Sequence, residues 1–199
     1  MILKSINPYT GQLLADFEEY QENELQQITD RSEEAFQSWR KTNFDTRKSI
    51  LLNTANLLIE DTELLAKIIT DEMGKTKSES VAEIRKCAWV CEHYANDAAL
   101  LLHKEAVATE ASEAYISYEP LGTILGIMPW NFPFWQVFRF AIPTICAGNT
   151  VVLKHASNVP QCALAIEEVF RKAGFPEHVF SNLMIGSDKV EQVIRHKMV

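Results

Sequence analysis

The sequence has few of the features that mark membrane-bound, secreted or nucleic-acid-binding proteins. Only four of its 199 residues are cysteines, and no uninterrupted apolar run approaches the roughly 18 residues that a membrane helix requires. The formal net charge is -8, and the segment from Asp16 to Glu34 holds eight acidic residues and one basic residue. A surface that binds nucleic acid needs clustered lysine and arginine. We therefore expect neither a nucleic-acid partner nor a membrane.

The N-terminal residues lack the apolar core of a signal peptide, which favours a cytoplasmic protein. Cysteines in that compartment remain reduced thiols. Cys87 and Cys91 lie four positions apart with His93 close by, a spacing that could suggest a metal ion. No second ligand pair of the zinc-site type follows them. We expect no metal site and interpret these cysteines as packing residues.

The N-terminal half of the chain predicts helices, because its apolar residues recur at helical spacing. The four expected helices cover residues 21–41, a segment starting at Asn43 or Asp45, residues 62–73 and residues 78–103. Gly74 stands where a helix end needs left-handed backbone angles. After the fourth helix, alternating residues around Tyr115 predict a two-stranded ribbon over 105–118. Such a ribbon is marginal in water by itself and needs a partner.

The last third alternates short apolar runs with amphipathic segments, which predicts an α/β fold with a βαβαβα unit. The expected strands are 123–128, 150–154 and 179–184, and the expected helices are about 134–147, 160–173 and 187–197. Right-handed crossovers make such strands parallel and bring their carboxyl ends to one edge. The continuous apolar run of the first strand is typical of a strand buried on both faces.

Polar residues follow these strands. Asn131 comes just after the first strand, Lys154 ends the second and Gly186 follows the third, so one crevice could hold all three. An asparagine amide offers N–H donors that stabilise an oxyanion without adding a charge. Asparagine and proline are also ordinary turn residues, so a capped strand-to-helix turn is an equally simple interpretation of this segment.

Residues 129–133 read PWNFP, with EPLG before them and AGNTVVLKHAS and AGFPEHVF after them. In this order and spacing, the segments resemble the aldehyde dehydrogenase superfamily, most densely over 119–186. The resemblance implies that Asn131 is the catalytic oxyanion-hole amide and that Lys154 bonds the adenosine ribose of NAD or NADP. It also implies that the nicotinamide half lies beside the backbone of Ile127, Met128, Pro129 and Trp130. The common Gly-x-Gly-x-x-Gly fingerprint is absent, and the family binds its cofactor without it.

The same resemblance implies that these residues are the N-terminal part of a family member. The family's nucleophilic cysteine, general-base glutamate and glycine-containing cofactor loop lie beyond Val199, so we expect the 199-residue chain to be inactive alone. The implied layout is an arm and helical part of the cofactor domain (1–104), an oligomerisation ribbon (105–118) and an incomplete Rossmann-like NAD(P)-binding region (119–199). We expect a homo-oligomer formed through the ribbon. The alternative is a truncated, noncatalytic fragment that only binds nucleotide or associates with subunits.

Ser157 bears on the choice of cofactor. NAD-preferring relatives often have a glutamate at this position, and a carboxylate would repel the 2′-phosphate of NADP, whereas a serine can donate to it. Ser157 also fits a helix-cap residue, since Asn158 and Pro160 follow it. We expect NADP to be at least tolerated.

The predicted helix after PWNFP indicates the substrate. Phe132, Gln136 and Arg139 follow at helical spacing on the face that would line the substrate tunnel. An arginine on an otherwise apolar helix suits a carboxylate ligand. Succinate-semialdehyde dehydrogenases resemble this chain in having arginine at that place, which implies succinate semialdehyde as the aldehyde. The alternative is a structural ion pair between Arg139 and one of the many carboxylates.

Overall fold

The computed structural model describes residues 2–197 and residue 199. Its helices and strands, in chain order, are β1 (Ile2–Ile6), β2 (Leu13–Glu18), α1 (Glu22–Trp39), α2 (Phe44–Glu60), α3 (Thr62–Met73), α4 (Lys77–Leu101), β3 (Glu105–Ala106), β4 (Tyr115–Ile116), β5 (Thr123–Met128), α5 (Trp135–Cys146), β6 (Thr150–His155), α6 (Pro160–Ala173), β7 (Phe180–Asn182), the 3-10 turn η1 (Ser187–Lys189) and α7 (Val190–Ile194).

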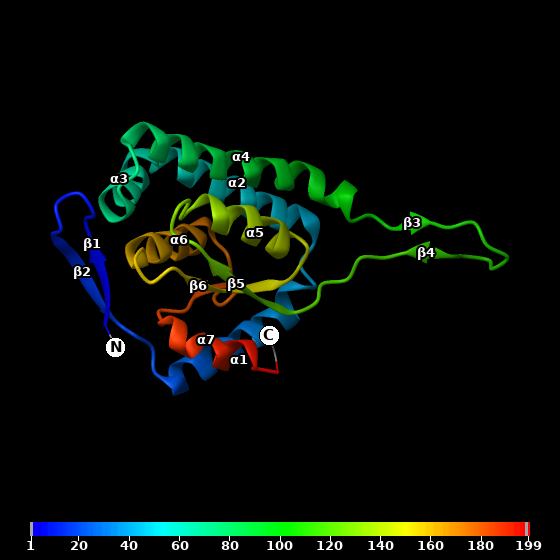
Figure 1. The fold of residues 1–199 in the computed structure, drawn as a ribbon. Helices are drawn as coiled ribbons and strands as arrows, with labels where there is room; N and C mark the ends of the chain where they lie inside the picture. Colours follow the sequence, from blue (N-terminus) through cyan, green and yellow to red (C-terminus); the bar gives the residue numbers. More distant parts are fainter. Residues whose placement is uncertain (1, 198) are drawn as a thin grey trace.

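A parallel sheet with the order β5-β6-β7 forms the centre of the molecule. Helices α5 and α6 cover one face, and α1 and α7 lie on the other (Figure 1). Every residue of β6 is buried because helices cover both faces of this middle strand. Val151 and Leu153 face the larger core, whereas Val152 faces the smaller one with Leu25 of α1 and Val193 of α7. The predicted α/β fold with parallel strands is confirmed.

Helices α2, α3 and α4 form an outer layer beyond α5 and α6 (Figure 1). Helix α5 can approach β5 closely because the strand has a glycine at the crossing. A Cβ atom on Gly126 would lie 2.5 Å from the ring of Phe140. Any side chain at Gly126 would therefore force the Phe140 ring to move.

Carboxylates from the outer helices cap the inner ones. The N-cap residues of α5 and α6 are Phe134 and Val159, neither of which bonds the helix end through its side chain. Glu72 of α3 instead accepts the N–H groups of Gln161 and Cys162, each at 2.8 Å. Burial raises the pKa of Glu72, and these hydrogen bonds oppose that rise. The free N–H groups of each helix end thus find their acceptors in a distant segment.

Three expectations about the elements need correction. The strand 123–128 was predicted to be buried on both faces, but only its residues Thr123 and Gly126 are fully buried, and Ile127 is 53% exposed. The third strand is shorter than predicted, covering Phe180–Asn182. The last helix is also shorter, because a 3-10 turn precedes α7. Within residues 2–197 and 199, none of the helices combines the length and apolar character needed to cross a bilayer.

Strands β3 and β4 pair antiparallel in a long hairpin that projects away from the body of the molecule (Figure 1). The paired part is short, with Glu105 opposite Ile116 and Ala106 opposite Tyr115. The two strands show only exposed residues. The hairpin therefore has almost no packing against the rest of the described chain.

Candidate active site

The carboxyl ends of β5 and β6 form one edge of the sheet. Ile127 pairs with Lys154, and Met128 pairs with His155, so the segments that follow the two strands start side by side. Gly186 follows β7 and begins the 3-10 turn. This is the arrangement that the crossover rule predicts for the three positions.

The loop from Pro129 to Phe134 connects β5 to α5 and exposes the residues of the PWN sequence. Trp130 is 51% exposed, Phe132 is 45% exposed and Asn131 is also an exposed residue. Among the described residues, the Asn131 side chain has no hydrogen-bond partner, and it does not cap α5. Its N–H donors are therefore available to a ligand at the edge of the sheet.

Lys154 differs from the surface lysines because its side chain is largely buried, with only 6% of the residue exposed. Its Nζ atom donates to the Ser157 hydroxyl at 3.1 Å. Burial lowers the pKa of Lys154, while the nearby charges of Glu19 and Asp188 raise it. The remaining donors of the ammonium group and the serine hydroxyl suit a ribose hydroxyl or a 2′-phosphate.

The helical face predicted to line a substrate tunnel begins at the same loop. Phe132 lies under the ammonium group of Lys75, with 3.7 Å between Nζ and the ring centroid. Gln136 is partly buried, and its backbone N–H donates to the Phe132 carbonyl at 3.0 Å. Arg139 is exposed and makes no ion pair with any residue in the described ranges. The structural ion pair that we considered for Arg139 is therefore not formed there, and its guanidinium is open to solvent.

Two cavities flank the loop. One of about 220 Å³ lies between Phe132, Trp135 and the α4 residues Glu83 and Lys86. The other, of about 310 Å³, lies between Trp130, Asn158 and the hairpin in which β1 pairs antiparallel with β2. Charges of both signs border each cavity: Lys86 and glutamates of α4 line the first, and Lys4 and Glu72 line the second.

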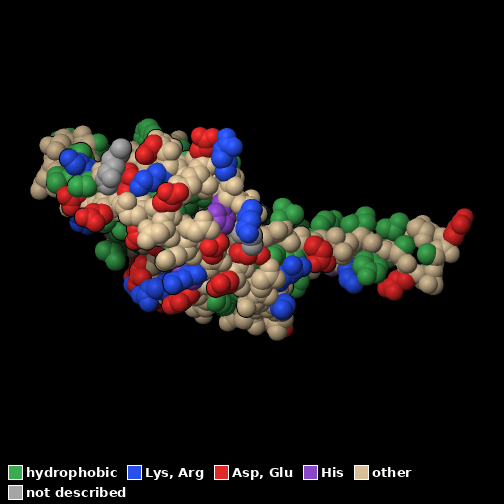
Figure 2. Space-filling model, turned by 90° about the horizontal axis from the view of Figure 1, so that it is seen from below, with side chains coloured by type: hydrophobic (Ala, Val, Ile, Leu, Met, Phe, Trp, Pro, Cys, Tyr) green, Lys and Arg blue, Asp and Glu red, His purple; other side chains and the backbone are tan. Residues whose placement is uncertain are grey.

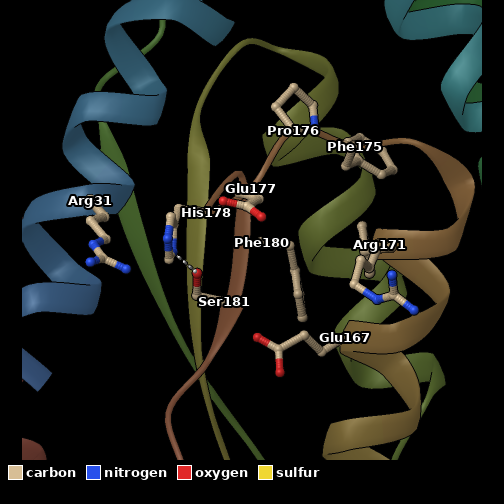
Figure 3. A pocket seen from close by; sticks show the side chains of 10 residues that line it. Arg31, Glu167, Arg171, Phe175, Pro176, Glu177, His178, Phe180 and Ser181 are labelled. Atoms are coloured by element: carbon tan, nitrogen blue, oxygen red, sulfur yellow. Dashed lines mark hydrogen bonds between the residues drawn. The ribbon is translucent and has the colours of Figure 1, made fainter. Parts of the chain in front are cut away.

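A further cavity, of about 350 Å³, lies at the opposite edge of the sheet (Figure 3). Its wall includes Phe175 and His178 from the loop that leads into β7, and Arg31 from α1. His178 points to Ser181 across 3.4 Å (Figure 3). This cavity lies beside β7, between α1 and α6, and neither Asn131 nor Lys154 is among its lining residues.

The four cysteines are free and buried. Burial raises the pKa of Cys146 to about 11 and raises that of Cys162 well above its usual value. A nucleophilic cysteine needs the opposite environment, in which the thiolate is stabilised and accessible. No group of three or more potential metal ligands occurs in the described part of the chain, and the Cys87 and Cys91 thiols are buried within α4.

Four residues next to the loop were not predicted to be functional. Glu83 accepts the N–H groups of Phe134 and Trp135, at 2.8 and 2.9 Å. Lys75 pairs with Glu83, and Lys86 covers the Trp135 ring at 3.9 Å. His155, the last residue of β6, contacts the Pro133 carbonyl at 2.9 Å. Only the position of His155 directly after Lys154 gave a sequence signal for any of these contacts.

Comparison with known proteins extends this description. The sequence pattern of the aldehyde dehydrogenase family matches residues 1–199. A probable succinate-semialdehyde dehydrogenase [NADP(+)] of Synechocystis sp. is 47% identical over 194 residues, which are 98% of this chain and 43% of that protein. A succinate-semialdehyde dehydrogenase [NADP(+)] of Mycobacterium tuberculosis is 42% identical over 202 residues, covering 100% of this chain and 44% of that protein.

Solved structures agree with the sequence relatives. The succinic semialdehyde dehydrogenase of Streptococcus pyogenes in complex with NADP+ superposes with a TM-score of 0.95 at 35% identity, over 99% of this chain and 44% of that one. An aldehyde dehydrogenase of Brucella melitensis gives a TM-score of 0.95 at 25% identity over 100% of this chain and 42% of that one. The chain thus spans less than half the length of these relatives. It belongs to the aldehyde dehydrogenase family.

Proposed function

We propose that this chain provides the oxyanion and cofactor groups of an NADP+-dependent succinate-semialdehyde dehydrogenase. By the complete enzyme we mean residues 1–199 together with the remaining length that family members have. The observation that carries the proposal is the exposed, unbonded Asn131 amide at the same sheet edge as the Lys154–Ser157 pair. The exposed guanidinium of Arg139 is on α5, about one helical turn after its first residue, Trp135.

In this proposal the Asn131 amide donates to the aldehyde oxygen as negative charge develops on it. A donor held in place before the reaction stabilises the transition state more than the substrate. The nucleophile and the general base come from the part of the family's length that these residues do not include. NADP+ accepts a hydride when it is bound, and water supplies the oxygen that turns the aldehyde into an acid. Lys154 and Ser157 would bind the cofactor ribose, and the backbone of 127–130 would lie along its nicotinamide half.

NADP+ is favoured over NAD+ in this proposal because Ser157 leaves room and a donor for the 2′-phosphate. The ammonium group of Lys154 is 3.1 Å from the Ser157 hydroxyl, so both can contact the same ribose substituent. The Synechocystis and Streptococcus pyogenes relatives are described with NADP+, which supports this choice.

Replacing Ser157 by glutamate in the complete enzyme should lower kcat/KM for NADP+ relative to NAD+ by about tenfold or more. A carboxylate beside Lys154 would repel the 2′-phosphate and compete for the ammonium group, at a cost of at least about 1.4 kcal/mol. Steady-state kinetics with each cofactor measure the ratio. Ser157→Ala is the matched control, which removes the hydroxyl without adding charge. An unchanged ratio in Ser157→Glu would exclude a contact with the 2′-phosphate.

Succinate semialdehyde is the proposed substrate because Arg139 is an arginine without a protein partner in the described chain. A guanidinium grips a carboxylate with two parallel hydrogen bonds. Phe132 and Gln136 lie on the same side of the helix start and would contact the short chain between the two ends of the substrate. The names of the Synechocystis and Mycobacterium relatives support the same aldehyde.

Replacing Arg139 by leucine should raise KM for succinate semialdehyde at least tenfold, or about 1.4 kcal/mol. The KM for butanal, an aldehyde of similar length without the carboxylate, should stay nearly constant. Arg195→Leu is the control, since it removes the same charge from an exposed helix away from the loop. Equal losses with both aldehydes would mean that Arg139 supports the fold and does not select the substrate.

The β3–β4 hairpin is the proposed oligomerisation element. Its exposed apolar and aromatic side chains are Val107, Tyr115, Ile116 and Tyr118. Figure 2 shows hydrophobic side chains along much of the projecting arm. A hairpin with so little support from its own chain gains stability by pairing with another subunit. We propose a homo-oligomer formed through 105–118, a division at this ribbon into the regions 1–104 and 119–199, and a cytoplasmic location that keeps the four thiols reduced.

A further inference from the structure

His155 connects the two segments that the proposed function needs to hold together. It is the last residue of β6, directly after Lys154, and only 4% of it is exposed. Its Nδ1 atom accepts the N–H of Ala156 at 2.8 Å, so the ring proton is on Nε2. Nε2 then donates to the carbonyl of Pro133 at 2.9 Å. One neutral imidazole thus bonds Ala156, directly after β6, through Nδ1 and Pro133, in the loop before α5, through Nε2.

The ring remains neutral near neutral pH. Burial lowers the pKa of His155 to about 4, with a smaller contribution from the charge of Lys154 and an opposing one from the Pro133 hydrogen bond. A charged ring would also lose the acceptor that holds the Ala156 N–H. The two hydrogen bonds are therefore a fixed feature of the folded protein under ordinary conditions.

The Pro133 carbonyl receives this donor because the first turn of α5 does not occupy it. The N–H of Gln136 donates to the Phe132 carbonyl at 3.0 Å, and the N–H of Phe138 donates to the Phe134 carbonyl at 2.9 Å. The carbonyl between them points to His155. A buried carbonyl without a donor is unfavourable, so this hydrogen bond gives the loop a definite position.

Glu83 fixes the same loop from the other side. Its side chain, 4% exposed for the residue as a whole, accepts two successive N–H groups at the start of α5 and pairs with Lys75. Asn131 itself has no such contact among the described residues. Its place relative to a ligand is therefore set by the backbone of Pro133 and its neighbours, which His155 and Glu83 hold.

We propose that His155 is a positioning residue that fixes the Asn131 amide relative to the cofactor strand. This inference rests on the proposed function of Asn131. Successive residues of a strand point to opposite faces, so Lys154 reaches the cofactor side while His155 reaches the loop before α5. The two side chains belong to consecutive residues of β6, so a displacement of the strand moves both. A cofactor bound by Lys154 and an aldehyde oxygen bound by Asn131 are thereby held at a constant distance and orientation.

The test is a double-mutant cycle between His155 and Asn131 in the complete enzyme. His155→Leu should lower the single-turnover rate of NADPH formation by about tenfold to a hundredfold, the scale of a misplaced catalytic group. The dissociation constant of NADP+ should change much less. His155→Gln retains an N–H donor at a similar reach and should restore most of the rate. His93→Leu, on the exposed side of α4, is the matched control.

The cycle distinguishes positioning from general support of the fold. If His155 acts through Asn131, His155→Leu should slow the Asn131→Ala enzyme far less than it slows the unaltered enzyme. Equal factors in both backgrounds, or an unchanged rate in His155→Leu, would overturn the proposal. If His155→Leu does not fold, His155→Asn, whose amide is too short to reach Pro133, takes its place in the cycle. A normal rate in Asn131→Ala alone would instead contradict the proposed function.

Discussion

Replacing Asn131 by alanine in the complete enzyme should lower kcat by about 10²–10³, the usual cost of losing one oxyanion donor. The side chain makes no hydrogen bond with the described residues and does not cap α5, so its removal should leave the fold unchanged. Saturating aldehyde and NADP+ in a steady-state assay measure the change. KM for NADP+ should stay within about threefold, because the cofactor contacts are made by other groups.

Asn96→Ala provides the control for this experiment. Asn96 lies on α4, where its amide donates to the Glu92 carbonyl within the same helix. Its replacement should not alter kcat. A loss of kcat of less than about threefold in Asn131→Ala would exclude the oxyanion role. In a site shielded from water, even a single weak donor changes kcat by more than that.

The 199-residue chain by itself should show no aldehyde oxidation. Its cysteines are all buried, and burial raises the pKa of Cys146 and of Cys162, so neither thiol forms the exposed thiolate that acyl chemistry requires. The purified chain can be assayed with saturating aldehyde and cofactor by following NADPH formation. The expected result is a rate indistinguishable from the reaction without protein.

The same assay identifies the source of any activity that does appear. Turnover that persists through purification and disappears on Cys146→Ser or Cys162→Ser would show that one of these thiols is a nucleophile. That result would favour an unexpected catalytic site within these residues. Turnover that is unaffected by either substitution would indicate a contaminating enzyme.

The parallel sheet could be predicted because its signals are local. Strand β6 contains the short apolar run of residues 151–153, and the glycine after α6 marks the helix end with left-handed angles at Gly174. Handedness then places Asn131 and Lys154 at one edge, and the register of Ile127 with Lys154 agrees. These steps need only periodicity and the rule for crossovers.

The support of the loop could not be predicted, because it depends on contacts between residues far apart in the sequence. Glu83 is on a long helix with many acidic and basic residues, and nothing local distinguishes the buried carboxylate from its exposed neighbours. Nothing local distinguishes His155 from a structural residue at the end of a strand. The exposure of Ile127 also escaped prediction, since an apolar run does not reveal whether other segments cover both faces of a strand along its whole length.

The substrate preference of the complete enzyme tests the central claim most directly. With NADP+ as cofactor, kcat/KM for succinate semialdehyde should exceed that for butanal at least about tenfold, because only the former has a carboxylate for Arg139 to bind. Equal values for the two aldehydes, or a preference for butanal, would contradict the proposal that these residues bind an aldehyde with a carboxylate at its other end.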